Sequence, residues 1–145
     1  MVKRVNIDSI NLPELVYYRT LRQPVEHLRN GIFIAEGEKV VNRLLESDIE
    51  IISALMTPEW YETYREYFDN KGGQITVYIG VKELLEEIVG YNLHQGIMAT
   101  AKIPLPADIE SILSSSASPH LFVAMDGLTN SENIGVLVRN CAAFG

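Results

Sequence analysis

Between residues 32 and 102 the sequence changes repeatedly between short apolar runs and amphipathic stretches, with a period of about twenty residues. The apolar runs predict strands at residues 32–35, 51–56, 75–79 and 96–101. The stretches between them predict helices at residues 37–46, 60–68 and 81–89. A further short helix is expected at residues 14–22, after Pro13.

Strands that alternate with helices of this length are typical of parallel sheets whose crossover helices cover both faces. The first 103 residues are therefore expected to form one three-layer α/β domain. The apolar positions Val40, Val41, Leu44 and Leu45 recur at helical spacing, which supports an amphipathic helix packed on that sheet.

A connecting segment is predicted at residues 104–119, where prolines and serines accumulate around a short helical pattern at 107–113. Residues 120–145 then begin a new unit, with a continuous apolar strand at 121–125, a loop, and a helix from about Asn133 to the end. One strand and one helix cannot cover a parallel sheet, so this unit is expected to be an incomplete domain. Because its apolar faces are exposed, this unit is expected to self-associate, to exchange elements with another copy of the chain, or to lose structure at the ends of its elements.

Composition narrows the functional classes. The chain has 145 residues, is 47% hydrophobic and carries a net charge of −7, which argues against a general polyanion binder. Residues 1–30 are locally basic, with five Lys and Arg against three Asp and Glu, so a basic face and an ordinary solvated helix surface both remain open. A single cysteine and three scattered histidines give no metal-ligand spacing, and no metal site is expected. No apolar run is long enough to span a bilayer, and a cytoplasmic protein is expected.

The most informative stretch is residues 121–145, in which an apolar strand ends in Asp126. Ligands of open α/β sheets bind beyond the carboxyl ends of strands, where the loop after Asp126 would lie. Gly135, Arg139 and Ala142 recur at helical spacing, so one helix face would present a guanidinium between small residues. The plainer alternative is that Asn133, or a capping box at residues 129–132, only caps the helix.

This stretch resembles the first motif of the SpoU or TrmH class of RNA 2′-O-ribose methyltransferases, within the SPOUT superfamily. The resemblance rests on Asn133-x-Gly135-x-x-x-Arg139, followed by Phe144-Gly145 and preceded by the strand that ends in Asp126. Residues 33–37, Phe-Ile-Ala-Glu-Gly, and residues 94–97, His-Gln-Gly-Ile, are similar to the N-terminal substrate-binding domain of the same family. These motifs occur in the family's order over most of the chain.

The resemblance implies that Asn133 and Arg139 are catalytic residues, at a site where a ribose 2′-hydroxyl attacks the methyl group of S-adenosylmethionine. Arginine stays protonated in proteins, so an orienting role for Arg139 is easier to defend than a role as general base, and both are left open. The family's later motifs form its trefoil knot and bind the methyl donor. We therefore expect the cofactor to bind only the full-length parent, with no cofactor-binding residue in this chain and no methylation by the chain alone.

The first domain, by the same resemblance, is an RNA-recognition domain similar to ribosomal proteins, and its ligand would be structured tRNA or rRNA. The residues that it would use are Arg19, Arg22, Arg29, Glu36, Gly37, His94, Gln95 and Gly96. Each also has a structural alternative, because the glycines can serve tight turns, Glu36 can favour a helix start and His94 can be partly buried. The parent is expected to be a homodimer.

Two other functions are alternatives for this sequence. A free-standing RNA-binding module does not explain why Asn133, Gly135 and Arg139 follow the first domain. A small nucleotide-binding α/β protein would need a glycine-rich phosphate loop, and neither G-x-G-x-x-G after the first strand nor a P-loop lysine is present.

Overall fold

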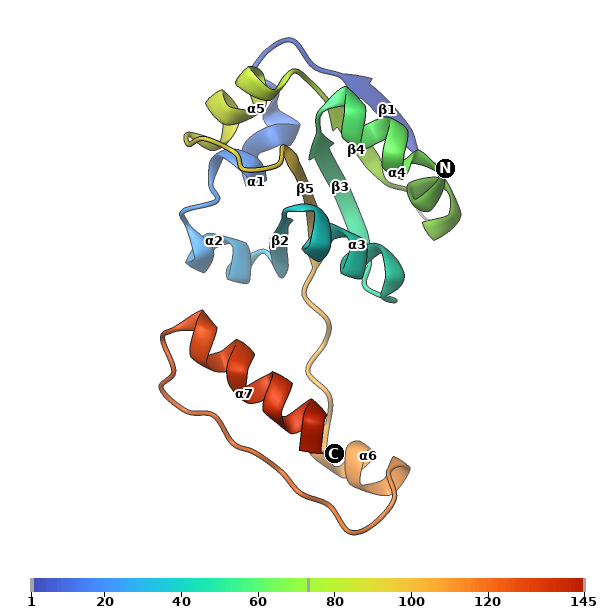
Figure 1. The fold of residues 1–145 in the computed structure, drawn as a ribbon, viewed down its shortest axis with the longest axis vertical. Helices are drawn as coiled ribbons and strands as arrows, with labels where there is room; N and C mark the ends of the chain where they lie inside the picture. Colours follow the sequence, from blue (N-terminus) through green and yellow to red (C-terminus); the bar gives the residue numbers. More distant parts are fainter. Residues whose placement is uncertain (1, 73, 145) are drawn as a thin grey trace. The chain divides into compact units, whose positions relative to one another are not determined.

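The structure is a computed structural model that describes residues 2–72 and 74–144. The chain divides into two compact units, Met1–Leu105 and Pro106–Gly145, which Figure 1 shows in blue to yellow and in orange to red. Each unit is described separately below.

Most of the regular structure lies in the first unit. Its strands are β1 (Lys3–Asn6), β2 (Ile32–Glu36), β3 (Ile51–Met56), β4 (Thr76–Ile79) and β5 (Ile97–Lys102). Its helices are the 3-10 turn η1 (Pro13–Leu15), α1 (Val16–Arg19), α2 (Pro24–Arg29), α3 (Glu38–Glu46), α4 (Pro58–Lys71) and α5 (Lys82–Val89). The four predicted strands and the three helices between them are confirmed, with their ends shifted by a few residues.

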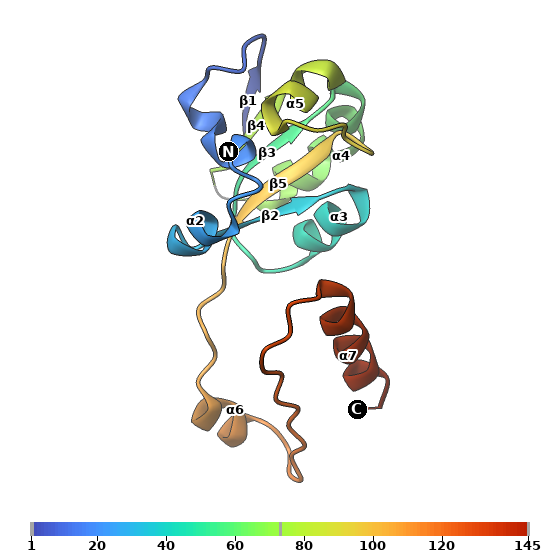
Figure 2. The same ribbon diagram turned by 90° about the vertical axis from the view of Figure 1, so that its left-hand side faces the viewer.

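The strands form one five-stranded sheet in the order β1-β4-β3-β5-β2. β1 and β3 both pair with β4 in parallel, whereas β5 pairs antiparallel with β3 and with β2. The expectation of an all-parallel sheet was therefore wrong. The Thr57 N–H, just after β3, donates to the carbonyl of Gly96, just before β5, at 3.0 Å. Because β5 enters the sheet at the end where β3 leaves it, β5 has to run in the opposite direction (Figure 2).

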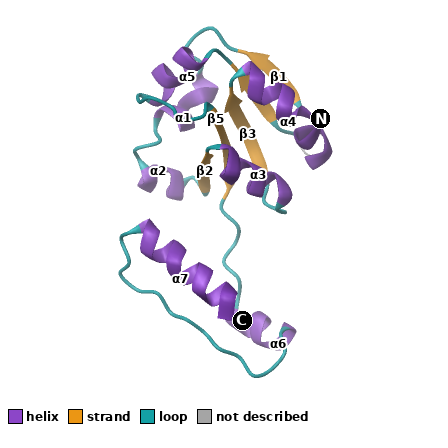
Figure 3. Cartoon of the chain, in the orientation of Figure 1, coloured by secondary structure: helices purple, strands orange, loops and turns teal. Residues whose placement is uncertain are grey.

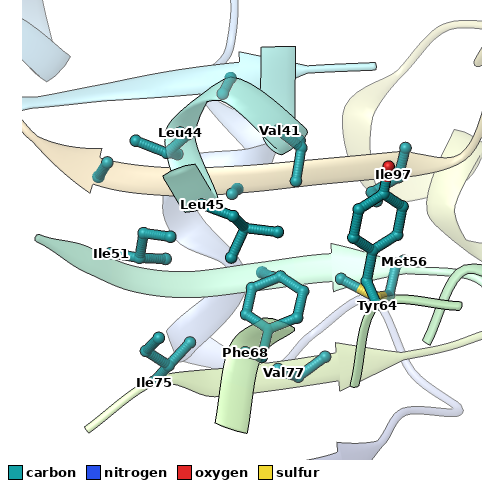
Figure 4. Close-up of a cluster of buried hydrophobic side chains, with 14 of the residues drawn as sticks. Val41, Leu44, Leu45, Ile51, Met56, Tyr64, Phe68, Ile75, Val77 and Ile97 are labelled. Carbon is teal, nitrogen blue, oxygen red and sulfur yellow. The ribbon is translucent and has the colours of Figure 1, made fainter. Parts of the chain in front are cut away.

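Two packed cores lie on opposite faces of this sheet. On one face, apolar side chains of α3 and α4, among them Val41, Leu44 and Phe68, pack onto alternate residues of β3, β4 and β5 (Figure 4). On the other face, Leu15 and Tyr18 of η1 and α1 pack with the apolar side of α5. The first unit is thus a three-layer α/β structure, and the period-2 alternation of its strands explains how one sheet serves both cores.

The second core contains a buried polar contact. The Tyr18 hydroxyl and the Ser53 Oγ lie 2.8 Å apart, and both residues are buried. Burial raises the pKa of Tyr18 to about 12, although the hydrogen bond to Ser53 acts in the opposite direction. Thr100, fully buried nearby, has a side-chain oxygen without a hydrogen-bond partner among the described residues. The contact attaches α1 to the middle of the sheet.

The N-terminal region differs from the sequence prediction. β1 was not predicted, because its four residues, Lys-Arg-Val-Asn, are mostly exposed and do not alternate as a half-buried strand does. The single helix expected at residues 14–22 is divided into η1 and α1, and α2 follows after Pro24. Proline at the first position of a helix is favourable, so α2 begins there rather than continuing α1.

The second unit contains α6 (Ile109–Ser115) and α7 (Ser131–Phe144), joined by a long irregular segment that Figure 3 draws as loop. The Asp108 side chain caps α6 by accepting a hydrogen bond from the Ser111 N–H at 3.0 Å. The strand predicted at residues 121–125 is absent from the structure. A strand requires a neighbouring strand for its backbone hydrogen bonds, and within this unit the apolar run has none. The helix predicted from Asn133 is confirmed and begins two residues earlier.

None of the helices in the described part of the chain is both long and apolar enough to cross a membrane. Within residues 2–72 and 74–144, no group of three or more His, Cys, Asp or Glu side chains is placed to hold a metal ion.

Candidate nucleic-acid interface

Two of the motifs singled out in the sequence meet at the carboxyl end of β2. Glu36 is the last residue of β2, and Gly37 follows with φ +88° and ψ 156°, a conformation open to glycine but strained for other residues. The Gly37 N–H donates to the carbonyl of Ile97, the first residue of β5, at 2.9 Å. The antiparallel pairing of β2 and β5 therefore places Glu36-Gly37 beside Gln95-Gly96, almost sixty residues away in the chain.

Gln95 caps helix α3 from outside that helix. The glycine at the N-cap position has no side chain, so it cannot satisfy the free N–H groups of the first turn. The Gln95 Oε1 accepts a hydrogen bond from the Glu38 N–H at 2.7 Å instead. A β-carbon at position 37 would lie only 3.0 Å from this same oxygen. Gly37 is thus required both for its backbone conformation and for the space that the Gln95 amide occupies.

Two aromatic residues complete the cluster, and sequence reasoning missed both. The Trp60 Nε1 donates to the carbonyl of Gln95, which supports the turn before β5 from the side of α4. The Tyr91 hydroxyl donates to Glu36 Oε2 at 2.7 Å. Burial, followed by the neighbouring Glu36 carboxylate, raises the pKa of Tyr91 far above its usual range, so its hydroxyl remains a donor. The sequence offered one signal for Tyr91, because this tyrosine lies between Gly90, which ends a predicted helix, and the His-Gln-Gly turn.

Arg22 is the basic residue that the structure connects to this cluster. Its guanidinium carbon lies 5.8 Å from the centroid of the Tyr91 ring, within the range of a cation–π contact. Arg22, Tyr91 and Glu36 therefore form a continuous chain of contacts on an exposed surface. We use the name turn cluster for the set Arg22, Glu36, Gly37, Trp60, Tyr91, Gln95 and Gly96.

The other predicted RNA-binding residues have no described contact with the turn cluster. The Arg19 guanidinium donates to the backbone carbonyl of Ile10. Arg29 is exposed in the last turn of α2, and His94 is exposed beside Gln95 in sequence. The buried histidine is His27, whose Nε2 lies 2.9 Å from the Thr20 Oγ1.

In the second unit, the predicted catalytic residues Asn133 and Arg139 both lie on α7 and are exposed. The cap of α7 is supplied by Asn130, whose Oδ1 accepts from the Glu132 N–H at 2.7 Å. Among the described residues the Asn133 side chain makes no hydrogen bond, so its alternative role as the helix cap is not observed. The Arg139 Nη1 lies 3.3 Å from where a β-carbon of Gly135 would be, so the guanidinium lies along the glycine face of the helix.

The comparisons with known proteins agree on one class. No protein-family model matches the chain. A Mycobacterium tuberculosis protein named as an uncharacterized tRNA/rRNA methyltransferase is 26% identical over 137 residues, which are 91% of this chain and 46% of that protein. A Ralstonia nicotianae protein named as a 23S rRNA (guanosine-2′-O-)-methyltransferase is 33% identical over 64 residues, 43% of this chain and 26% of that protein. The chain thus spans less than half the length of these curated relatives.

Solved structures show the same fold. An RNA 2′-O ribose methyltransferase matches 98% of this chain and 52% of its own with a TM-score of 0.59 and 18% identity. The rRNA methyltransferase of Sinorhizobium meliloti in its AdoMet-bound form matches 68% of this chain and 36% of its own, with a TM-score of 0.54 and 19% identity. The mixed α/β fold is that of RNA methyltransferases. More narrowly, the resemblance to the SpoU-type RNA ribose 2′-O-methyltransferases that the motifs predicted is confirmed.

Proposed function

We propose that this chain is the RNA-recognition part of an S-adenosylmethionine-dependent ribose 2′-O-methyltransferase of tRNA or rRNA. The observation that carries the proposal is the turn cluster, which brings Glu36-Gly37 and Gln95-Gly96 together and links them through Tyr91 to a cation, Arg22, with Glu36 and Arg22 exposed at the surface. The names of the relatives support RNA as the ligand.

Within this proposal, the arginines set affinity, and Glu36 and Gln95 of the turn cluster set selectivity. Arg22 would contact phosphate, with Arg19 and Arg29 as further phosphate contacts on the same N-terminal segment, since guanidinium groups match phosphate geometry. Glu36 and Gln95 would contact base edges, and His94 lies next to them in sequence. Gly37 is partly exposed and would let the RNA approach the backbone there, whereas Gly96 is buried beside Thr57 and would act by holding the turn that positions Gln95.

The proposed division of the chain is a recognition domain at residues 1–103, a connection at 104–119 and a catalytic segment at 120–145. Asn133 and Arg139 are the proposed catalytic residues of that segment. Asn133 would orient the ribose through its amide, and Arg139 would hold the neighbouring phosphate, because a guanidinium that stays protonated is a poor base. Gly135 would leave room for the Arg139 guanidinium against the helix.

S-adenosylmethionine supplies the methyl group in this class of reaction. The described residues of the second unit do not fit it well. The groove between residues 121–125 and α7 is lined by apolar side chains, mainly Leu121, Phe122, Val123, Met125 and Phe144, with Asn140 as the amide among them. An adenosyl group needs several hydrogen-bond partners, which this lining lacks. We therefore propose that the chain alone neither binds the donor nor methylates RNA.

The exposed apolar residues of the second unit also support a proposal of self-association. Leu121 is 89% exposed and Phe144 91% exposed, far more than large apolar side chains in a packed domain. Light scattering after size-exclusion chromatography is expected to show dimers or larger species. A monomer at all concentrations contradicts this part of the proposal.

The experiment that tests the proposed function is a pair of titrations with the whole chain. Fluorescence anisotropy with a tRNA transcript and with an rRNA hairpin is expected to show binding that weakens with salt. Calorimetry with S-adenosylmethionine is expected to show no heat of binding. Arg22→Ala should lower the salt dependence by about one phosphate contact, whereas Arg43→Ala, which removes an exposed arginine paired with Glu46, should not.

Two outcomes overturn the proposal. If neither RNA binds at low salt, the recognition role is wrong. If S-adenosylmethionine binds the chain, the proposal that the chain alone does not bind the methyl donor is wrong.

A further inference from the structure

The turn cluster contains the carboxylate of Glu36 and the amide of Gln95. The hydrogen-bonding atoms that they have left are an acceptor on Glu36 and a donor on Gln95. Glu36 Oε2 accepts from Tyr91, and among the described residues Oε1 accepts from no donor. The Gln95 Oε1 is occupied by the Glu38 N–H. Because only the oxygen of an amide can accept that bond, the group of Gln95 left without a partner among the described residues is its NH2, a donor.

The negative charge of Glu36 restricts what it can contact in an RNA. A carboxylate is repelled by phosphate, so its favourable contacts in an RNA interface are with donors, either the N–H groups of a base or a ribose 2′-hydroxyl, and of these only the base edge differs between nucleotides. It is also held in place, since the Tyr91 hydroxyl orients it and Arg22 lies against the Tyr91 ring. A cation so placed offers the phosphate contact that would offset this repulsion.

The bases differ in how well they match such a pair. Guanine has two adjacent donors on its Watson–Crick edge, N1–H and the N2 amino group, beside the acceptor O6. A carboxylate accepts from both donors at once, and an amide NH2 donates to O6. Adenine and cytosine each present one amino donor on this edge, and uracil presents one imino donor.

We propose that the turn cluster reads an unpaired guanine in the RNA, with Glu36 accepting from N1–H and N2 and Gln95 donating to O6. This inference rests on the proposed function and specifies the feature that the first unit recognises. The base read here belongs to the recognition element, so its identity does not specify which nucleotide is methylated. Sequence-specific reading of RNA usually targets unpaired bases whose Watson–Crick edges are accessible, which agrees with an exposed site.

The test uses RNA hairpins with one stem and a five-uridine loop in which the central nucleotide is guanine, inosine, adenine, cytosine or uridine. Affinities are measured by fluorescence anisotropy at fixed salt. The guanine loop is expected to bind about tenfold more tightly than the adenine loop. Inosine, which lacks the N2 amino group, should fall between them.

Variants separate base reading from general affinity. Glu36→Gln should remove the preference for guanine, because an amide can accept through only one of its two atoms. Glu66→Gln makes the same change of charge on an exposed residue of α4 and should keep the preference. Tyr91→Phe removes the hydroxyl that orients Glu36 and should reduce the preference without removing salt-dependent binding. Circular dichroism verifies that each variant is folded.

Equal binding of all five loops, or a preference for guanine that survives in Glu36→Gln, overturns the inference while the proposed function stands. If no hairpin binds and the structured RNAs also fail to bind, the proposed function and this inference are both wrong.

Discussion

The two units of this chain contain helices of similar length but differ in what those helices pack against. In the first unit, α4 has fourteen residues, of which Tyr64 and Phe68 are buried in a core shared with the sheet. In the second unit, α7 also has fourteen residues, yet its described side chains are exposed or only partly buried. Both segments are helical, but α4 buries apolar side chains in a core, and such burial supplies most of the stability of a helix of this length.

The same contrast applies to the apolar runs. Residues 51–56 are apolar except for Ser53, and residues 121–125 are apolar throughout, and the first run is β3, hydrogen-bonded on both sides. The second forms no strand, and Leu121 and Phe122 are exposed. A strand is a property of a sheet, so an apolar run becomes one only where a neighbour supplies its hydrogen bonds.

The largest expected difference between the units is in local stability. Amide hydrogen exchange followed by mass spectrometry should show slow exchange in β3 and β5 and fast exchange across residues 121–130. If the first unit opens only by global unfolding, about 5 kcal/mol or more, its protection factors should exceed those of residues 121–130 by over ~10³. Comparable protection in both regions would mean that the second unit has its own cooperative core.

A matched pair of truncations should give the next largest effect. Phe68→Ala removes a fully buried ring and should lower the free energy of unfolding by about 3–5 kcal/mol. Phe144→Ala removes the same ring from a site that is 91% exposed and should change it by less than about 0.5 kcal/mol. Urea unfolding followed by far-UV circular dichroism, which reports on the helices of both units, measures both. Similar losses in the two variants would show that Phe144 is buried in solution.

The buried tyrosine of the first unit predicts a stability change at alkaline pH. The pKa of Tyr18 is raised from 10.0 to about 12 in the folded state, so the protonated form is favoured by folding. Its contribution is complete below pH 10 and is lost between about pH 10 and 12, a loss on the order of 3 kcal/mol.

Unfolding measured across this range should therefore depend less steeply on pH in Tyr18→Phe than in the parent sequence. Tyr17→Phe changes the neighbouring, partly exposed tyrosine and serves as the control with the parent profile. An unchanged slope in Tyr18→Phe would show that Tyr18 does not ionise on unfolding as described.

The smallest effect is expected from glycines with positive φ. Gly37→Ala should cost about 1–3 kcal/mol, because the backbone is strained and the new carbon meets the Gln95 oxygen that caps α3. Gly127 also has positive φ, at +66°, but no atom lies within 4 Å of its β-carbon position. Gly127→Ala lies in a loop that can adjust and should cost less than about 1 kcal/mol. Thermal unfolding compares the two, and equal losses would indicate that loop 126–130 is as rigid as the turn cluster.

Local sequence pattern was a good guide wherever a segment's environment follows from its own residues. The runs 51–56 and 75–79 are largely buried and are apolar except for Ser53 and Thr76, and helices α3 and α5 have clear amphipathic spacing. β1 was not predicted because it lies at the edge of the sheet. Lys3 and Arg4 are exposed there, and the strand does not alternate between apolar and polar residues.

The candidate site was only partly predictable for a similar reason. Glu36, Gly37, Gln95 and Gly96 were found as motifs, but Trp60 and Tyr91 became part of the site only through contacts across the fold. Arg19, Arg22 and Arg29 were indistinguishable in sequence, and the structure connects Arg22 alone of the three to the turn cluster.

The sequence by itself determined where most helices and strands lie, the glycine turns, and the resemblance to RNA ribose methyltransferases, since these depend on local spacing and residue type. Only the tertiary structure decided that β5 runs antiparallel between β3 and β2, and that Gln95 caps a helix that begins 57 residues earlier. Strand direction and adjacency follow from hydrogen bonds and burial between distant segments, which no local pattern encodes. The same dependence on distant partners explains why residues 121–125, apolar as they are, form no strand within their own unit.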